Sequence, residues 1–140
     1  MASILKVDTL TGVTTAGSIA VTGEGNSTTT NLQQGLAKHW VKLDASSGTP
    51  TARDSLNNSS LTDTAQARIG INFSSSFGND DYAMTGTGSN NYTNTQSKDI
   101  VKNSDQTDTS SLSNVMTKYG GQGDGEDRDD VSVVHHGDLA

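Results

Sequence analysis

Three histidines are the side chains in this sequence best suited to metal binding or acid–base chemistry. His135 and His136 are adjacent in a stretch that alternates like a strand, and neighbouring residues of a strand point to opposite faces of a sheet. These two rings therefore do not converge on one metal ion, whereas His39, on another predicted strand, could approach one of them. We interpret His135 and His136 as one core and one surface histidine, with a metal site as the weaker alternative.

A second candidate is the acidic, glycine-rich stretch at 120–130. Carboxylate oxygens on a flexible loop are ligands that Ca²⁺ prefers. The stretch resembles the calcium-binding nonapeptide of β-roll proteins, but Gly125 stands where that motif has Asp, and no second copy occurs. The alternative is a solvated hairpin loop, so we expect no cofactor, with bound Ca²⁺ as the weaker hypothesis. The candidate ligands are Asp124, Glu126, Asp127, Asp129 and Asp130.

No set of residues in the sequence indicates catalysis. Ser and Thr occur throughout the chain, so a Ser near a His is not informative. The only glutamates are Glu24 and Glu126, and nothing marks two aspartates as a buried pair. No glycine-rich phosphate loop precedes a helix. We therefore expect that the protein is not an enzyme.

Composition narrows the class of partner. The formal net charge is −7, and the nine Lys and Arg residues are scattered singly, whereas nucleic-acid binding needs clustered basic residues. No stretch approaches the roughly 20 apolar residues of a membrane helix. The chain has no Cys, which excludes disulfides and thiolate chemistry. We expect protein partners, and neither nucleic acid nor membrane.

Apolar and polar residues alternate along most of the sequence, which is typical of half-buried strands. Ser, Thr and Asn make up about a third of the chain, and hydrophobic residues only 30%. At 69–73 the apolar side chains of Ile69, Ile71 and Phe73 share one face, and 131–136 forms a similar final strand. About eight short strands separated by turn signals predict an all-β fold, an antiparallel β-sandwich or jelly-roll-like barrel.

The first 36 residues differ from the rest because they are poor in large side chains. They contain two short predicted strands, at 4–10 and 18–22, and one helical turn at 32–37. We therefore predict an extended N-terminal arm or docking segment at 1–36, followed by a β-sandwich domain at 37–140.

Trp40 is the only tryptophan, and the alternation places it with Lys38 and Lys42, on the face opposite Val41 and Leu43. Such a ring covers lysine stems or packs against a neighbouring subunit. We take Trp40, Lys38 and Lys42 as a candidate oligomer contact. A homo-oligomer, for example a trimer, would also cover strand edges that so polar a chain leaves open.

Six stretches carry a resemblance to a known group of proteins. They are SILKVDTL at 3–10, GSIAVTGEG at 17–25, LQQGLAKHWV at 32–41, ARDSLNNSSLTD at 52–63, IGINF at 69–73 and the close at 131–140. They are similar to small structural proteins of marine and freshwater bacteriophages of the cyanophage type, labelled as decoration or tail-fibre proteins. The resemblance is weak at 86–128. It implies a role in the virion and supplies no catalytic residues.

We therefore expect a non-enzymatic structural protein exposed on the virion surface. It would decorate the capsid or form part of a fibre-like appendage of the tail or neck, with the major capsid, tail or neck proteins as partners. The alternative is a carbohydrate- or calcium-binding, lectin-like module for host attachment. Its site would lie on the loops at 86–99 and 120–130, with Tyr92 or Tyr119 stacking on a sugar. Only 4% of residues are aromatic, which favours the structural role.

Overall fold

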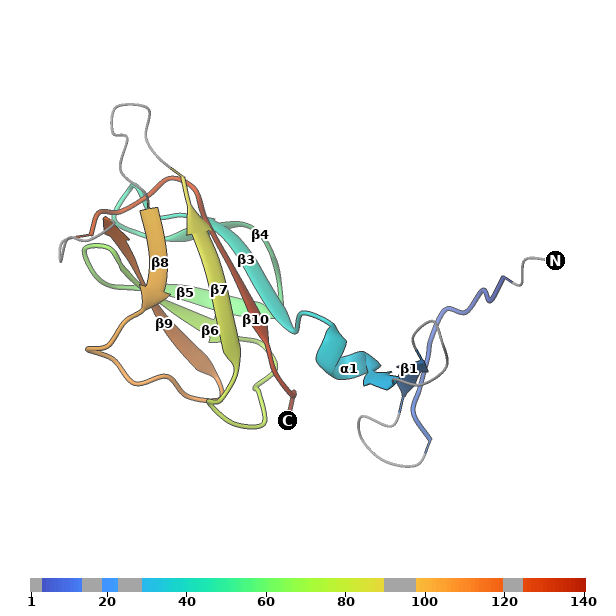
Figure 1. The fold of residues 1–140 in the computed structure, drawn as a ribbon. Helices are drawn as coiled ribbons and strands as arrows, with labels where there is room; N and C mark the ends of the chain where they lie inside the picture. Colours follow the sequence, from blue (N-terminus) through green and yellow to red (C-terminus); the bar gives the residue numbers. More distant parts are fainter. Residues whose placement is uncertain (1–3, 14–18, 23–28, 90–97, 120–124) are drawn as a thin grey trace. The chain divides into compact units, whose positions relative to one another are not determined.

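The computed structural model contains two compact units, Met1–Leu36 and Ala37–Ala140. The residues that it describes are 4–13, 19–22, 29–89, 98–119 and 125–140 (Figure 1). Within them lie ten short strands and one short helix, and the paired strands are antiparallel. The prediction of an all-β fold is confirmed at this level.

The N-terminal unit has little regular structure in its described part. Strand β1 (Ala20–Thr22) pairs with β2 (Thr29–Asn31), and the four-residue helix α1 (Leu32–Gly35) follows directly. The helix agrees with the helical turn predicted at 32–37. None of the residues in β1 is buried, so this pair is held by its backbone hydrogen bonds and not by a core.

The strand predicted at 4–10 does not form, and that prediction is wrong. The described residues 4–13 have no regular secondary structure, and Leu5 is 81% exposed. Alternation alone does not make a strand, because the backbone N–H and C=O groups need a partner strand. No described strand pairs with this segment.

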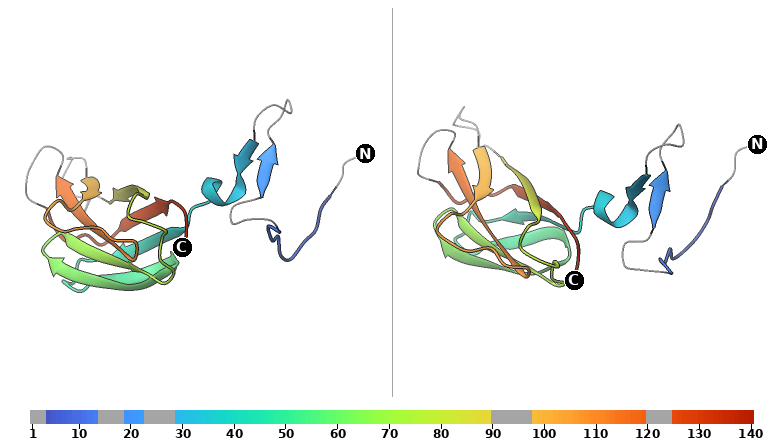
Figure 2. Two further views of the ribbon diagram at one scale, coloured as in Figure 1. Left: turned by 90° about the horizontal axis from the view of Figure 1, so that it is seen from below. Right: turned by 60° about the horizontal axis from the view of Figure 1, so that its bottom comes forward.

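The second unit is one antiparallel sheet of eight strands in the order β4-β3-β10-β7-β8-β9-β6-β5. The strands are β3 (His39–Asp44), β4 (Thr51–Leu56), β5 (Asn58–Ala65), β6 (Arg68–Phe73), β7 (Ala83–Gly88), β8 (Lys98–Lys102), β9 (Leu112–Tyr119) and β10 (Val131–His136). Strands β4 and β5 stand at opposite ends of this order, yet they contact each other, so the sheet nearly closes into a barrel (Figure 2).

A single residue, Asn57, joins the two end strands β4 and β5. Its φ of 59° lies in the left-handed region, which Asn tolerates better than most residues. The side chain stabilises this corner in both directions. Its Nδ2 donates to the Ser75 carbonyl at 3.0 Å, and its Oδ1 accepts from the Ser75 backbone N–H at 2.6 Å. The corner thus turns the chain from one edge of the sheet to the other.

The core of the barrel follows from the alternation. Ile69, Ile71 and Phe73 are buried as predicted, and Val41 and Leu43 are buried on β3. Each fully buried side chain of this kind contributes roughly 1.5–3 kcal/mol relative to an exposed one. The other core residues are Ala45, Phe77, Tyr82, Ile100, Val115, Val131 and Val133.

Gly86 allows β7 to approach β8 closely inside the barrel. A Cβ at this position would lie 2.9 Å from Ile100 Cβ and 2.9 Å from the Ser132 carbonyl oxygen. Both are parts of the structure that cannot rotate away. Gly70 differs, because a Cβ there would lie 3.4 Å from Leu112 Cδ1 at its nearest contact, which is ordinary van der Waals distance.

We expect Gly86→Ala to destabilise the barrel by about 1–3 kcal/mol, because the added methyl group overpacks the contact between β7 and β8. Urea unfolding followed by circular dichroism measures the effect. Gly70→Ala is the matched control, and we expect it to be neutral or slightly stabilising. Equal losses in the two variants would contradict the close approach at Gly86.

Candidate functional site

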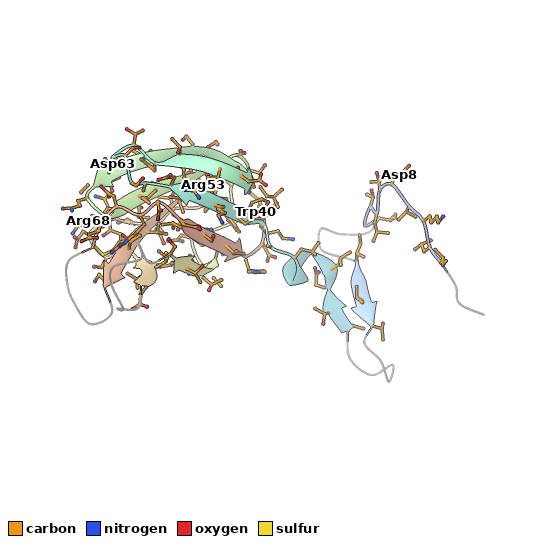
Figure 3. All side chains as sticks on the ribbon, turned by 90° about the horizontal axis from the view of Figure 1, so that it is seen from above. Asp8, Trp40, Arg53, Asp63 and Arg68 are labelled. Carbon is orange, nitrogen blue, oxygen red and sulfur yellow. The ribbon has the colours of Figure 1, made fainter. Side chains whose placement is uncertain are left out.

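Trp40 lies on the outer surface of β3, as the alternation predicted. Residues 39, 41 and 43 are buried, whereas Trp40 is half-buried. In the register of the sheet it stands between Leu56 on β4 and Val134 on β10. Val134 points outward, and Leu56 is 48% exposed. We call these three residues the Trp40 row; Figure 3 labels Trp40 on the barrel.

The two lysines beside Trp40 in the sequence have different surroundings, since Lys42 lies on β3 and Lys38 precedes it. Lys42 Nζ is 3.3 Å from Asp130 Oδ2, and the two side chains are 47% and 35% exposed, so water screens the pair and it contributes at most about 1 kcal/mol. The Lys38 backbone N–H donates to the His135 carbonyl at 3.0 Å. The structure thus brings together Lys42 and Asp130, which belong to two separately predicted groups.

The aspartates of the acidic stretch that the structure describes turn towards different partners. Asp124 lies outside the described residues. Asp127 Oδ1 accepts from the Ala67 backbone N–H at 2.7 Å, at the turn between β5 and β6. Asp129 Oδ1 accepts from Ser89 Oγ at 3.2 Å, at the end of β7. These carboxylates anchor the stretch to neighbouring turns.

Glu126 and Arg128 form an ion pair at the centre of the same stretch. Glu126 Oε2 is 3.1 Å from Arg128 Nη2, and Arg128 is only 6% exposed. The main chain is also held, since the Arg128 carbonyl accepts from the Ala45 N–H at 2.6 Å and the Glu126 carbonyl accepts from Thr117 Oγ1 at 2.5 Å. Sequence reasoning did not single out Arg128, and its burial was not evident from the charged residues around it.

The described part of the acidic stretch does not form a ready Ca²⁺ cage. Among the described residues, no group of three or more His, Asp or Glu side chains is close enough together to hold a metal ion. A polar depression of about 240 Å³ does lie on this surface. Its lining residues are Ser46, Glu126, Asp127, Arg128 and Asp129.

Arg53 is an exposed residue that the sequence did not single out, and it contacts both Asp44 and the acidic stretch. Strand β4 bulges relative to β3 here, and Arg53 Nη2 donates both to Asp44 Oδ2 at 3.0 Å and to the Asp129 carbonyl. The hydroxyl and backbone N–H of Ser46, followed by Arg53, lower the pKa of Asp44 to about 2. Arg53 thus links the edge of the sheet to the acidic stretch.

The histidines divide as the sequence predicted, into core and surface. His39 and His135 are fully buried, and their Nδ1 atoms are 2.9 Å apart. His135 Nε2 is 3.0 Å from Ser113 Oγ on β9. His136 is exposed on the other face of β10. The sequence indicated that His39 could approach one of the pair, and the structure shows that this partner is His135.

Burial keeps both core rings uncharged at neutral pH. It lowers the pKa of His39 to about 4, although the side chain of Asn58 partly opposes the shift. Burial, followed by the neighbouring His39, lowers the pKa of His135 to about 3. Because both rings are fully buried, a dissolved substrate cannot contact them in this structure.

The structure does not describe the side chains of the two tyrosines that were candidates for stacking on a sugar. Tyr92 and the side chain of Tyr119 lie outside the described part of the chain, as does much of each loop that would carry such a site.

Comparison of the chain with protein-family models, with curated proteins and with solved structures gave no match. In the described part of the chain, no helix has both the length and the apolar character needed to span a membrane. Function is therefore inferred from composition, fold and surface.

We expect Asp127→Ala to destabilise the barrel by about 1–3 kcal/mol, because it leaves the buried Ala67 N–H without an acceptor. The matched variant Asp127→Asn keeps an amide oxygen at this position and should lose clearly less. The midpoint of urea unfolding measures both. If the two variants lose the same stability, the charge of Asp127 matters and the hydrogen bond does not.

Proposed function

We propose that this chain is a non-enzymatic structural protein of a phage virion. It decorates the capsid surface or forms part of a fibre-like appendage of the tail or neck, and it acts through packing against other copies and other virion proteins. The observation that carries the proposal is the contrast between a barrel with a packed core and an N-terminal unit whose large aliphatic side chains are left exposed.

The N-terminal unit has the properties of a docking segment. Five large aliphatic residues of segment 4–13 are each more than half exposed in the structure, and burying one such side chain contributes roughly 1.5–3 kcal/mol. A segment that gains so much from burial is stabilised by binding to a partner surface. We infer that residues 1–36 anchor the chain in the particle. The five residues are Ile4, Leu5, Val7, Leu10 and Val13.

The barrel is well suited to display on a particle. We propose that it is best described as a flattened sandwich with jelly-roll character, in which β4-β3-β10-β7 form one layer and β8-β9-β6-β5 the other. The single register pair Thr87–Asp99 between β7 and β8 supports a division at this point, because the other neighbouring strands share five or more pairs. The polar, acidic surface keeps such a particle soluble.

The Trp40 row is the contact that we propose between subunits. It places three apolar side chains side by side on the outside of three neighbouring strands, flanked by Lys38 and Lys42. Aromatic residues are enriched at the centre of protein interfaces, and long lysine stems can cover the rim. A symmetric homo-oligomer, such as a trimer, would bury this row and the neighbouring edge strand β4.

We expect Trp40→Asp to dissociate the oligomer, because it places an unpaired charge at the centre of the contact. Size-exclusion chromatography with light scattering measures the mass, and circular dichroism confirms that the variant folds. Ala65→Asp adds the same charge at an exposed position on β5 and should leave the mass unchanged. An unchanged mass in both variants would remove Trp40 from the interface.

Quantitative mass spectrometry of purified particles tests the virion role itself. A copy number near that of the major shell protein means capsid decoration, and a few tens of copies or fewer mean a tail or neck appendage. Absence from the particles would overturn the proposal and favour the alternative, a free carbohydrate- or calcium-binding module.

A further inference from the structure

The buried histidines belong to a chain of polar groups that crosses the inside of the barrel. Ser113 on β9, His135 on β10 and His39 on β3 follow one another at 3.0 and 2.9 Å. At the far end, His39 Nε2 and Asn58 Oδ1 are both buried, and neither makes a hydrogen bond in the described part of the chain. The Asn58 side chain nevertheless raises the pKa of His39, as an acceptor facing a ring N–H does.

One arrangement of protons accounts for all these groups. A neutral imidazole carries one N–H, so in the Nδ1–Nδ1 contact one ring donates and the other accepts. If His135 donates through Nδ1, its Nε2 accepts from Ser113 Oγ. His39 then carries its proton on Nε2, and the unpaired Oδ1 of Asn58, whose side chain influences the pKa of His39, is the buried acceptor available to it. The opposite assignment would leave His39 Nε2 without a hydrogen and the buried Oδ1 of Asn58 without a donor from this ring, which is unfavourable.

The rings lie in an apolar enclosure that excludes counter-ions. The ring centroid of His39 is 4.9 Å from that of Phe73, and the His135 centroid is 5.2 Å from those of Phe73 and Tyr82. Phe77 packs against the same cluster.

The charged groups around the enclosure do not stabilise a proton on either ring. Lys102 on β8 lies 5.2 Å from the Tyr82 ring centroid. Its positive charge, like that of exposed His136, lowers the pKa of His135. Asp108 Oδ2 is 3.0 Å from Lys102 Nζ. Burial raises the pKa of Tyr82, and the charges of Asp108 and Asp80 add to this shift. In the described residues, no carboxylate forms an ion pair with His39 or His135.

Protonation of this pair proceeds in two steps with different consequences. After one proton is added, His39 can donate through both nitrogens and His135 can donate to Ser113, so every hydrogen bond survives. After the second, both Nδ1 atoms carry hydrogens and face each other at a spacing of 2.9 Å. The rings must then separate, because two adjacent positive charges repel each other and each is stabilised by water outside the apolar enclosure.

We propose that Asn58, His39, His135 and Ser113 form an acid-sensitive latch, which holds β3 against β10 in neutral solution and releases this end of the barrel in acid. His39 is three residues beyond Leu36, the last residue of the N-terminal unit, so release frees the start of the strand by which the chain enters the barrel. This inference does not depend on the proposed virion role.

The direction of the pH dependence follows from the two pKa values. Both rings have a lower pKa in the folded chain than the ordinary 6.5, so the stabilisation is fully present above about pH 6.5. It is lost as the pH falls towards about 4 and then about 3.

Hydrogen exchange of the whole chain, measured from neutral pH down to about pH 3, tests the latch. After correction for the intrinsic pH dependence, we expect amides at the start of β3 and the end of β10 to exchange at least about tenfold faster in acid. Amides of β6 should stay protected over the same range. Simultaneous loss of protection in all strands would mean global acid unfolding and would overturn the latch.

Variants separate the latch from general acid effects. His135→Gln cannot gain a proton, so the accelerated exchange at β3 should disappear. The exposed control His136→Gln removes only the last-ranked influence on His135 and should keep the accelerated exchange. If the same acceleration persists in His135→Gln, the proposal is wrong.

A measurement on the unchanged protein covers the case in which His135→Gln does not fold. Imidazole nitrogen NMR should show His39 protonated on Nε2 and His135 on Nδ1, with neither ring titrating near 6.5. Ordinary titration of both rings near 6.5 would overturn the latch.

Discussion

Closure of the eight-stranded sheet is the constraint on which the rest of the barrel depends. With only 30% hydrophobic residues, no single layer of strands could bury enough apolar surface to be stable. When β4 and β5 come together, buried side chains of β3, β6, β8, β9 and β10 share one core, and Leu61 of β5 and Met84 of β7 pack against it. The two edge strands β4 and β5 are consecutive in sequence, and the turn at Asn57 leads the chain directly from one edge of the sheet to the other.

A small, closed core leaves little room for unpaired polar groups. Among the described residues, buried side-chain atoms without a hydrogen bond are His39 Nε2, Asn58 Oδ1 and Asn103 Nδ2, whereas other enclosed groups are paired. Thr117 donates to a carbonyl of the acidic stretch, and Asn114 donates its backbone N–H to Asp108 Oδ1 and its Nδ2 to the Thr107 carbonyl. The histidine pair is a demanding case, since burial, by lowering the pKa of both rings, keeps them neutral below about pH 6.5, where exposed rings would gain a proton. The barrel therefore couples its packing at one end to the protonation state of two side chains.

The core is held by apolar packing, whereas the acidic stretch on the surface is held by hydrogen bonds and ion pairs. The carboxylates of the acidic stretch accept hydrogen bonds from a backbone N–H and a hydroxyl or pair with basic side chains. These contacts tie the segment before β10 to β3, to the end of β7 and to the β5–β6 turn. This use of the charges supports a structural role for the stretch. The partly exposed Trp40 row and the exposed aliphatic side chains of the N-terminal unit, in contrast, are apolar surfaces, and the proposed contacts with other copies and other proteins would bury them.

Local alternation of apolar and polar residues was enough to determine the all-β class, the inward faces of β3 and β6 and the outward position of Trp40, because the pleat of a strand makes its side chains alternate. The same pattern wrongly predicted a strand at 4–10, since a strand also needs a partner that no local pattern specifies. Only the tertiary structure decided that His39 meets His135, 96 residues away, and that the acidic side chains diverge. Strand order is set by backbone hydrogen bonds between distant segments, and these bonds are the same for every residue type, so they leave no trace in the sequence.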